Sequence, residues 1–331
     1  MKKRVYGIAG ISSIMANWNA DFSGYPKTNS SRKIFGSDKA FKYPMKKMWE
    51  NQGKNVLYIK SMRFEEDKTG IHLIPRTLKE RYEQLFSVED LKQENDGKRI
   101  LENLFKAIDV KNFGATFAEA GNNISITGAV QFGQGFNKYE ESQAFDQPIL
   151  SPFRDPNAKE KSLKKSSKKQ DENADENGDE GKEARNSTIG TKIISDEAHY
   201  FYSFSIDPAV YKDFIELGVT DGYTEDDYCE FKKASMTAAT SYATNSKAGC
   251  ENEFSMFVET DEDVYLPNMA EHIVFEKGEK KNKVMIDCSS LLNEAGKGIQ
   301  NVEIYYNPYT IEIEHDIIKA KLYDIFTQKE I

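Results

Sequence analysis

The sequence predicts an α+β fold with an RRM-like or ferredoxin-like core that carries insertions. The expected elements follow the order of a split β-α-β unit: strand, helix and strand, then helix, strand and strand. The chain has 331 residues, 38% of them hydrophobic, which is enough for one large core. Residues 155–188 contain one leucine and no aromatic residue. We therefore expect one domain formed by residues 1–150 and 189–331, with residues 151–188 as a disordered or mobile loop.

The N-terminal part predicts a strand, a polar loop and a helix. Residues 4–14 are largely apolar, as in a buried strand, and the loop that follows carries several polar residues and one tryptophan. Ser37 and Asp38 favour a helix start. Pro44 predicts either a kink or a helix that begins there, and Gly53 predicts its end. The apolar stripe of this helix is formed by Phe41, Met45, Met48 and Trp49.

Further along the chain, alternating apolar residues and turn signals predict the remaining elements. Lys68-Thr69-Gly70 and Gly121-Asn122-Asn123 are expected to be hairpin turns. Thr224 and Asp227 are typical of a helix capping box. In a fold of this type an open sheet face can receive single-stranded nucleic acid. We expect helices at residues 88–109 and 224–243, and strands at residues 55–62, 71–74, 112–120, 124–132, 192–206, 253–259, 272–275, 283–286 and 302–306.

The charge distribution indicates a polyanionic partner. The net charge is −9, yet residues 1–60 hold 12 lysines and arginines against 3 acids, so this segment is +9 and the rest is −18. Nucleic-acid binding depends on where the cations lie, and a basic face can serve on an acidic protein. Lys39, Lys42 and Lys46 lie near a helix start whose dipole also attracts anions. The alternative is an ordinary solvated helix face.

Two loops offer groups that could hold a nucleic-acid chain. Trp18 could stack on a base while Asn17, Asn19 and Ser23 bind phosphate and sugar oxygens. Alternatively, the Trp18 indole folds back into the core. The second loop, residues 244–249, is suited to clasping phosphates through its backbone and Lys247, or it simply ends a helix.

Catalytic patterns are sparse in this sequence. The four histidines lie outside known metal or triad motifs, no phosphate-binding glycine motif occurs, and Cys229, Cys250 and Cys288 lack metal-ligand spacing. We expect inert thiols and no cofactor. Asp21 is the one candidate for a general base or metal ligand, although a lone aspartate is more often a turn former. No apolar run reaches about 18 residues, so we expect a cytoplasmic protein without a membrane partner.

Several blocks of the sequence resemble one protein family. Tyr6-Gly7-Ile8, residues 17–26 and residues 37–42 resemble the N-terminal signature of the backbone subunit of type I-B CRISPR surveillance complexes, the seventh family of CRISPR-associated proteins. Further blocks that look like the family are residues 113–115, 126–132, 199–202 and 245–249. Residues 113–117 also faintly resemble an RRM stacking strand. The chain differs in having Asn245 where the family commonly has arginine, and in its long insertion at 155–188.

The resemblance implies an RRM-like palm with a thumb hairpin and inserted finger regions. Copies of the chain would line up as a helical filament on one guide CRISPR RNA and, with other Cascade subunits, present it for pairing with target DNA. The subunit would be non-catalytic. From the residue patterns and the resemblance together, the expected RNA-contacting residues are Asn17, Trp18, Asn19, Ser23, Lys27, Lys39, Lys42, Lys46, Phe113, Gln131, Asn245 and Lys247.

Two other functions remain open at this point. One is a metal-dependent ribonuclease that uses Asp21, as in RNA-targeting CRISPR complexes whose backbone subunits resemble this chain in fold. The other is a binding protein unrelated to nucleic acid, whose acidic surface is the functional one.

Overall fold

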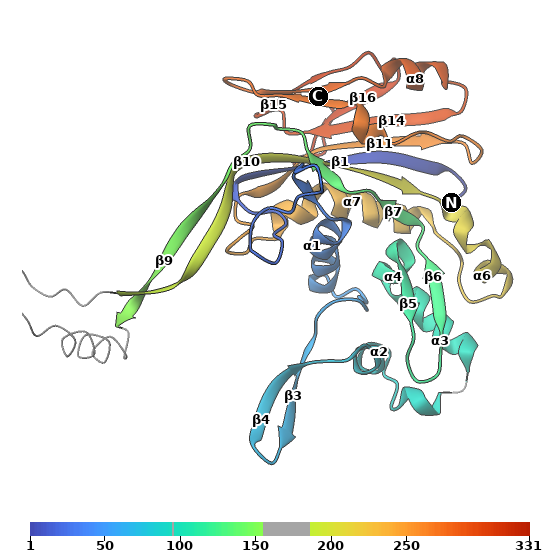
Figure 1. Ribbon diagram of the computed structural model, residues 1–331. Coiled ribbons are helices and arrows are strands. Elements are labelled where there is room, and N and C mark those ends of the chain that lie inside the picture. Colours follow the sequence, from blue (N-terminus) through green and yellow to red (C-terminus); the bar gives the residue numbers. More distant parts are fainter. Residues whose placement is uncertain (95, 155–185) are drawn as a thin grey trace, which may run out of the picture.

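The protein forms a mixed α+β architecture around one large sheet (Figure 1). The structure is a computed structural model that describes residues 1–94, 96–154 and 186–331. In the described residues the large sheet has nine strands in the order β16-β14-β11-β1-β10-β8-β2, with β7 and β9 also paired to β10. Their bounds are β1 Arg4–Ala16, β2 Phe35–Gly36, β7 Val130–Phe132, β8 Gly135–Asn137, β9 Ala144–Arg154, β10 Asn186–Ile206, β11 Cys250–Thr260, β14 Ile299–Tyr306 and β16 Ala320–Asp324.

Strand β1 lies in the middle of this sheet. It pairs antiparallel with β10 on one edge and with β11 on the other. Val5 and Ala9 face one hydrophobic core, and Tyr6 and Ile8 face a second core on the opposite side. A strand buried on both faces needs a nearly continuous apolar sequence, so the prediction of a strand at residues 4–14 is confirmed. A side chain at Gly7 would collide with the Phe204 ring, so only glycine fits there.

Helices α1 (Asp38–Asn51) and α7 (Glu225–Ser241) cover one face of the sheet, as Figure 1 shows. The Ser37 hydroxyl caps α1 by accepting from the Ala40 N–H at 3.3 Å. Pro44 is buried inside α1, so a helix start at Pro44 is wrong. The capping box of Thr224 and Asp227 is confirmed.

A C-terminal layer covers the other face of the sheet (Figure 1). Its apolar side chains share a core with Tyr6, Ile8 and Met256 of the large sheet. The prediction of an open sheet face is therefore wrong for these positions. The elements of this layer are η3 Met269–His272, β12 Ile273–Glu276, β13 Asn282–Ile286, α8 Ser289–Glu294 and β15 Ile311–Glu314.

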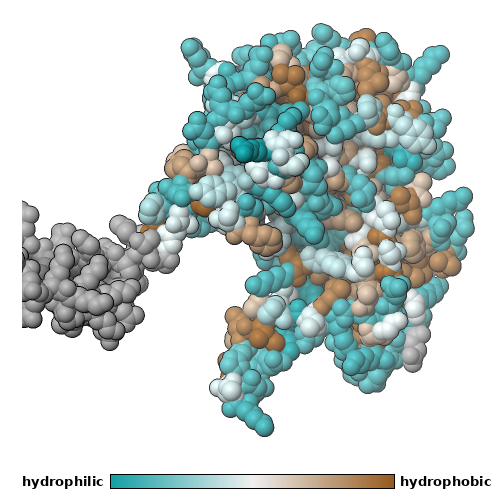
Figure 2. Space-filling model, in the orientation of Figure 1, coloured by the Kyte–Doolittle hydropathy of each residue, from teal (hydrophilic) through white to brown (hydrophobic). Residues whose placement is uncertain are grey.

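A second group of helices and hairpins lies below α1 and α7 in the view of Figure 1. The two predicted hairpin turns are confirmed by the pairs β3–β4 and β5–β6. Apolar side chains lie exposed on the β3–β4 hairpin (Figure 2), where Phe64 is 73% exposed. The bounds are β3 Met62–Asp67, β4 Gly70–Pro75, α2 Leu78–Phe86, η1 Leu91–Gln93, α3 Gly97–Lys106, α4 Ile108–Phe113, β5 Gly114–Phe117, β6 Ile124–Thr127, η2 Pro208–Tyr211 and α6 Lys212–Glu216.

In this region one prediction is wrong and another is confirmed only in part. Residues 55–61 form no strand, because the buried Asp109 carboxylate accepts from the N–H groups of Leu57 and Tyr58, each at 2.8 Å, and fixes an irregular path. The helix expected at 88–109 is divided into η1, α3 and the start of α4, with Asp96 capping α3. Helix α2 was not predicted, although Thr77 and Glu80 form a complete capping box.

Strands β9 and β10 continue beyond the body of the protein as a two-stranded arm (Figure 1). The loop predicted at residues 151–188 overlaps this arm, because residues 151–154 and 186–188 belong to β9 and β10. The remainder of that predicted loop, residues 155–185, lies outside the described residues.

A buried charge cluster ties the C-terminal layer to the sheet. His199 on β10 contacts the Glu253 carboxylate of β11 at 2.8 Å and Glu197 at 2.9 Å, and its ring stacks on Phe275 of the C-terminal layer. Burial by itself lowers the pKa of His199, but the two carboxylates outweigh it and raise the pKa to about 9. The His199 hydrogen bond, helped by Lys277, lowers the pKa of Glu197 to about 2. The histidine is therefore a cation at neutral pH.

We predict that His199→Gln destabilises the protein by about 3 kcal/mol near pH 6, because a buried carboxylate loses its cation. The folded pKa of His199 lies above its usual value of 6.5. Its stabilising effect is therefore complete below pH 6.5 and is lost as the pH rises through about 9. Urea unfolding from pH 6 to 10 should show the gap between wild type and variant closing. His72→Gln, on the exposed hairpin, is the control, and a pH-independent gap would contradict the assignment.

Candidate nucleic-acid interface

A groove of about 600 Å³ lies where four segments meet at one end of β1. These are the loop after β1, the first turns of α1, the loop after α7 and the base of the arm. Backbone hydrogen bonds hold the two loops together, from Ile14 N–H to Gly249 O at 2.9 Å and from Asn17 N–H to Ser246 O at 2.8 Å. Six predicted residues line the groove together: Asn17, Trp18, Asn19, Ser23, Asn245 and Lys247.

The electrostatics of the groove favour an anion. Among the described residues that line it, the charged ones are Lys192, on β10, and Lys247, and none of these lining residues carries a carboxylate. The other lining groups are amides, hydroxyls and aromatic edges, which are common contacts of phosphate and sugar oxygens. The groove can therefore accept a negatively charged chain without displacing an internal ion pair.

The prediction of an exposed Trp18 is wrong. The indole is 1% exposed and donates from Nε1 to the Tyr202 hydroxyl at 2.6 Å. Gly36 lies against both rings, and a side chain there would collide with them. A buried indole lacks a free face on which a base could stack, so Trp18 forms the floor of the groove.

Lys247 lies over this floor. Its Nζ is 4.1 Å from the Trp18 ring centre, a cation–π contact, and donates to the Trp18 carbonyl oxygen. Burial lowers the pKa of Lys247 to about 8. A phosphate in the groove would favour the charged form and raise this pKa again.

The polar residues of the first loop are already partly used in shaping it. The Asn17 Nδ2 donates to Gly24 O at 2.9 Å and to Ile193 O at 3.3 Å, which links the loop to the arm. Asn19 Oδ1 accepts from the Ser37 N–H at 2.8 Å. Asn245 is exposed in the second loop.

Asp21 forms a turn beside the groove. Its Oδ1 accepts from the Ser23 hydroxyl at 2.6 Å, the Ser23 N–H at 2.8 Å and the Tyr25 N–H at 3.2 Å. The Ser23 hydroxyl contributes most to lowering the pKa of this exposed carboxylate. The described residues contain no group of three or more acidic, histidine or cysteine side chains placed to hold a metal. The local geometry is that of a turn-forming aspartate.

The lysines of α1 do not form one free basic face. Lys42 pairs with Asp38 at 2.9 Å and Lys46 pairs with the buried Asp109 at 3.5 Å, while Lys39 is exposed. Burial lowers the pKa of Lys46, and Asp109 opposes that shift. Lys46 therefore holds α1 to the irregular segment 55–61, and its charge is neutralised within the fold.

Three further candidates lie away from the groove. Phe113 is half-buried between α4 and α1, where its ring contacts Lys42 and Lys46. Gln131 is exposed on β7 and donates to Gly128 O at 2.8 Å. Lys27 lies over the Phe35 ring. The structure thus brings six of the twelve predicted residues into one groove. The other six lie elsewhere on the molecule.

Among the lining residues that the sequence reasoning missed are Tyr43, Tyr242 and Lys192. Tyr43 and Tyr242 meet edge to face at one rim of the groove, with ring centres 5.5 Å apart. Tyr43 lies four residues after Lys39 on the solvent side of α1, and this spacing could have indicated it. Lys192 lies in a strand, and its position at the groove depends on how β10 pairs.

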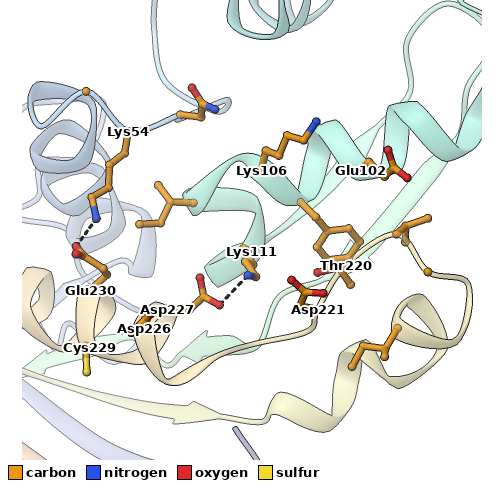
Figure 3. Close-up of a pocket in the computed structure, with 17 residues that line it drawn as sticks. Lys54, Glu102, Lys106, Lys111, Thr220, Asp221, Asp226, Asp227, Cys229 and Glu230 are labelled. Carbon is orange, nitrogen blue, oxygen red and sulfur yellow. Dashed lines mark ion pairs between the residues drawn. The ribbon is translucent and has the colours of Figure 1, made fainter.

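A second, larger cleft has a different character from the groove. It measures about 1270 Å³ and lies between α3, α4, α6 and the start of α7 (Figure 3). Lys54 pairs with Glu230 at 2.6 Å and Lys111 pairs with Asp227 at 2.8 Å across it. Its carboxylates outnumber its lysines, so this cleft would repel nucleic acid. The charged lining residues are Lys54, Lys106, Lys111, Glu102, Asp221, Asp226, Asp227 and Glu230.

We predict that Lys46→Ala lowers the free energy of unfolding by about 3 kcal/mol, because it leaves the buried Asp109 carboxylate without a cation. Lys39→Ala removes the same charge from an exposed position of the same helix and should change stability by less than about 0.5 kcal/mol. Urea denaturation measures both. Equal stabilities of the two variants would contradict the assignment of Lys46 to the fold.

Comparison with known proteins identifies the family. A family model described as CRISPR-associated protein Cas7 matches residues 3–296. A chain of a CRISPR RNA-guided surveillance complex in a pre-nicking state is similar in fold, with a TM-score of 0.51 at 12% identity, over 97% of this chain and 96% of that chain. A chain of another CRISPR RNA-guided surveillance complex has a TM-score of 0.46 at 12% identity, over 96% and 94% of the two chains.

No curated protein matches the sequence. None of the helices in the described residues has the length and apolar character needed to cross a membrane. The family model covers most of the chain, and the first structural match supports the mixed α+β fold. The chain belongs to the Cas7 family of CRISPR-associated proteins.

Proposed function

We propose that this chain is a non-catalytic backbone subunit of a type I-B Cascade complex that holds guide CRISPR RNA in the groove beside Trp18. The observation that supports this most is the pair Lys192 and Lys247 in a groove without a lining carboxylate. Copies of the chain would follow one another along the RNA and, with other Cascade subunits, present it to target DNA. The protein supplies charge and shape, and base pairing supplies sequence recognition.

We further propose that the core is RRM-like. Strand β1 lies between β10 and β11, with α1 after β1 and α7 between β10 and β11. This order agrees with a split β-α-β unit. RNA would then lie at the edge of the sheet, on the loops after β1 and α7, because the C-terminal layer covers one sheet face and the helices cover the other.

Head-to-tail assembly is supported by the charge pattern. The acid-rich cleft near α6 lies toward the other side of the molecule from the groove that would hold RNA, so a neighbouring copy could contact the cleft without displacing the RNA (Figures 1 and 3). Different patches on each copy would then meet, and such a contact generates an open helical filament when the rotation between copies does not close into a ring. The exposed apolar face of the β3–β4 hairpin is a further surface that a neighbouring copy could cover.

A non-catalytic role is consistent with the geometry of Asp21. One of its two oxygens, Oδ1, accepts from the donors of Ser23 and Tyr25 in a local turn. To test for cleavage, the assembled complex is incubated with Mg²⁺ and complementary target RNA. We expect intact RNA. Periodic cuts that disappear in Asp21→Ala would contradict the proposal and favour a ribonuclease.

We predict that Lys192→Gln and Lys247→Gln each weaken the binding of a labelled oligouridylate. Each variant should reduce the slope of log affinity against log salt by about 0.7, because one phosphate contact to a single strand is lost. Fluorescence anisotropy at several salt concentrations measures this. Lys280→Gln, an exposed position between β12 and β13, is the matched control. Unchanged slopes in both groove variants would contradict this site.

A further inference from the structure

Lys247 is a lysine without an acidic partner in the described residues. Its half-buried side chain lies over the Trp18 indole, with Nζ 4.1 Å from the ring centre, and Nζ donates to the Trp18 carbonyl oxygen. No carboxylate of the described chain, Asp21 of the neighbouring loop included, lies close enough to affect its pKa. Lys42 and Lys46 are also shielded from solvent, but each is paired with an aspartate. The Lys247 cation is stabilised only by an aromatic face and a carbonyl group.

The other groups around Lys247 do not supply the missing negative charge. The loop after β1 contributes the uncharged residues 17–20. The start of β11 contributes Cys250, where burial raises the pKa of the thiol and keeps it neutral at pH 8. Helix α1 and the end of α7 contribute the phenols of Tyr43 and Tyr242, and β10 contributes a second cation, Lys192. An anion that compensates Lys247 must therefore come from a ligand.

The protonation of Lys247 consequently changes within an accessible pH range. Burial without a carboxylate lowers the pKa of Lys247 from its usual 10.5 to about 8, so the charged form predominates below pH 8 and is lost above it. A phosphate brought beside Nζ supplies the missing anion and favours the charged form. Binding of a phosphate chain must then take up a proton wherever the free lysine is neutral.

We propose that Lys247 links nucleic-acid binding to pH, because the groove holds a phosphate at this position only when the side chain is protonated. This inference rests on the proposed function and concerns the regulation of the same groove. Lys247 supplies a charge that the medium can remove without any change in fold. Since every copy of the chain carries one groove, the effect is repeated at each copy along a filament.

The first test measures the affinity of the full-length protein for a labelled oligocytidylate between pH 7 and pH 9 at constant salt. Cytosine has no group that titrates in this interval, whereas uracil begins to lose a proton. We expect the affinity to fall about tenfold for each occupied groove, as follows from a pKa of about 8 in the free protein. Circular dichroism at each pH checks that the protein stays folded. An affinity that does not change across this interval would overturn the inference.

A substitution to arginine then identifies the residue responsible, because a guanidinium stays charged throughout. We expect Lys247→Arg to bind with nearly the same affinity at pH 7 and pH 9. Lys280→Arg, at an exposed position between β12 and β13, should keep the fall of about tenfold. His199, whose pKa is about 9, is present in all of these proteins, so its titration cancels in the comparison. A fall that persists in Lys247→Arg, or that disappears only in Lys192→Arg, would overturn the inference.

Calorimetry measures proton uptake directly in the wild type, and it remains decisive if Lys247→Arg does not fold. The heat of binding at pH 8 is compared in two buffers that differ in ionisation enthalpy. We expect uptake of about half a proton for each occupied groove, since about half of the free lysines are neutral at that pH. Binding without proton uptake would overturn the inference and leave the proposed function intact, whereas no binding at any pH would contradict both.

Discussion

The double pairing of β1 is the constraint on which the rest of the structure depends. Because β10 and β11 occupy its two edges, the loop after β1, the base of the arm and the loop before β11 must meet at the same end of the sheet. These three segments build the groove together with the start of α1. Residues separated by more than 200 positions, such as Trp18 and Lys247, are thereby brought into contact.

Burial and charge have separate roles in this arrangement. The Trp18 indole is hydrogen-bonded to Tyr202 in the core and forms the floor of the groove. Lys247 lies over the indole ring and supplies a positive charge to the groove. Lys42 and Lys46 are instead used within the fold, where they neutralise Asp38 and Asp109. The number of lysines and arginines in residues 1–60 therefore overstates the basic surface that is free to bind a ligand. Several of these side chains form ion pairs within the fold instead.

The sequence was most informative where a pattern is local. The strand at the N-terminus, the capping box at Thr224 and the hairpin at Lys68-Thr69-Gly70 follow from periodicity and turn chemistry. Residues 55–61 looked like a strand because their apolar side chains alternate, and the distant Asp109 decided otherwise. Whether Trp18 faces solvent or core depended on Tyr202, and the position of Lys192 depended on strand pairing, so neither could be predicted from spacing.

Amide hydrogen exchange of the full chain with and without an oligouridylate tests the central claim most directly, because it locates the bound chain without altering any residue. The account predicts increased protection in residues 17–26, 190–193 and 242–249, which form the groove, and little change around the acid-rich cleft at residues 215–230. Protection confined to that cleft, or to the C-terminal layer, would contradict it.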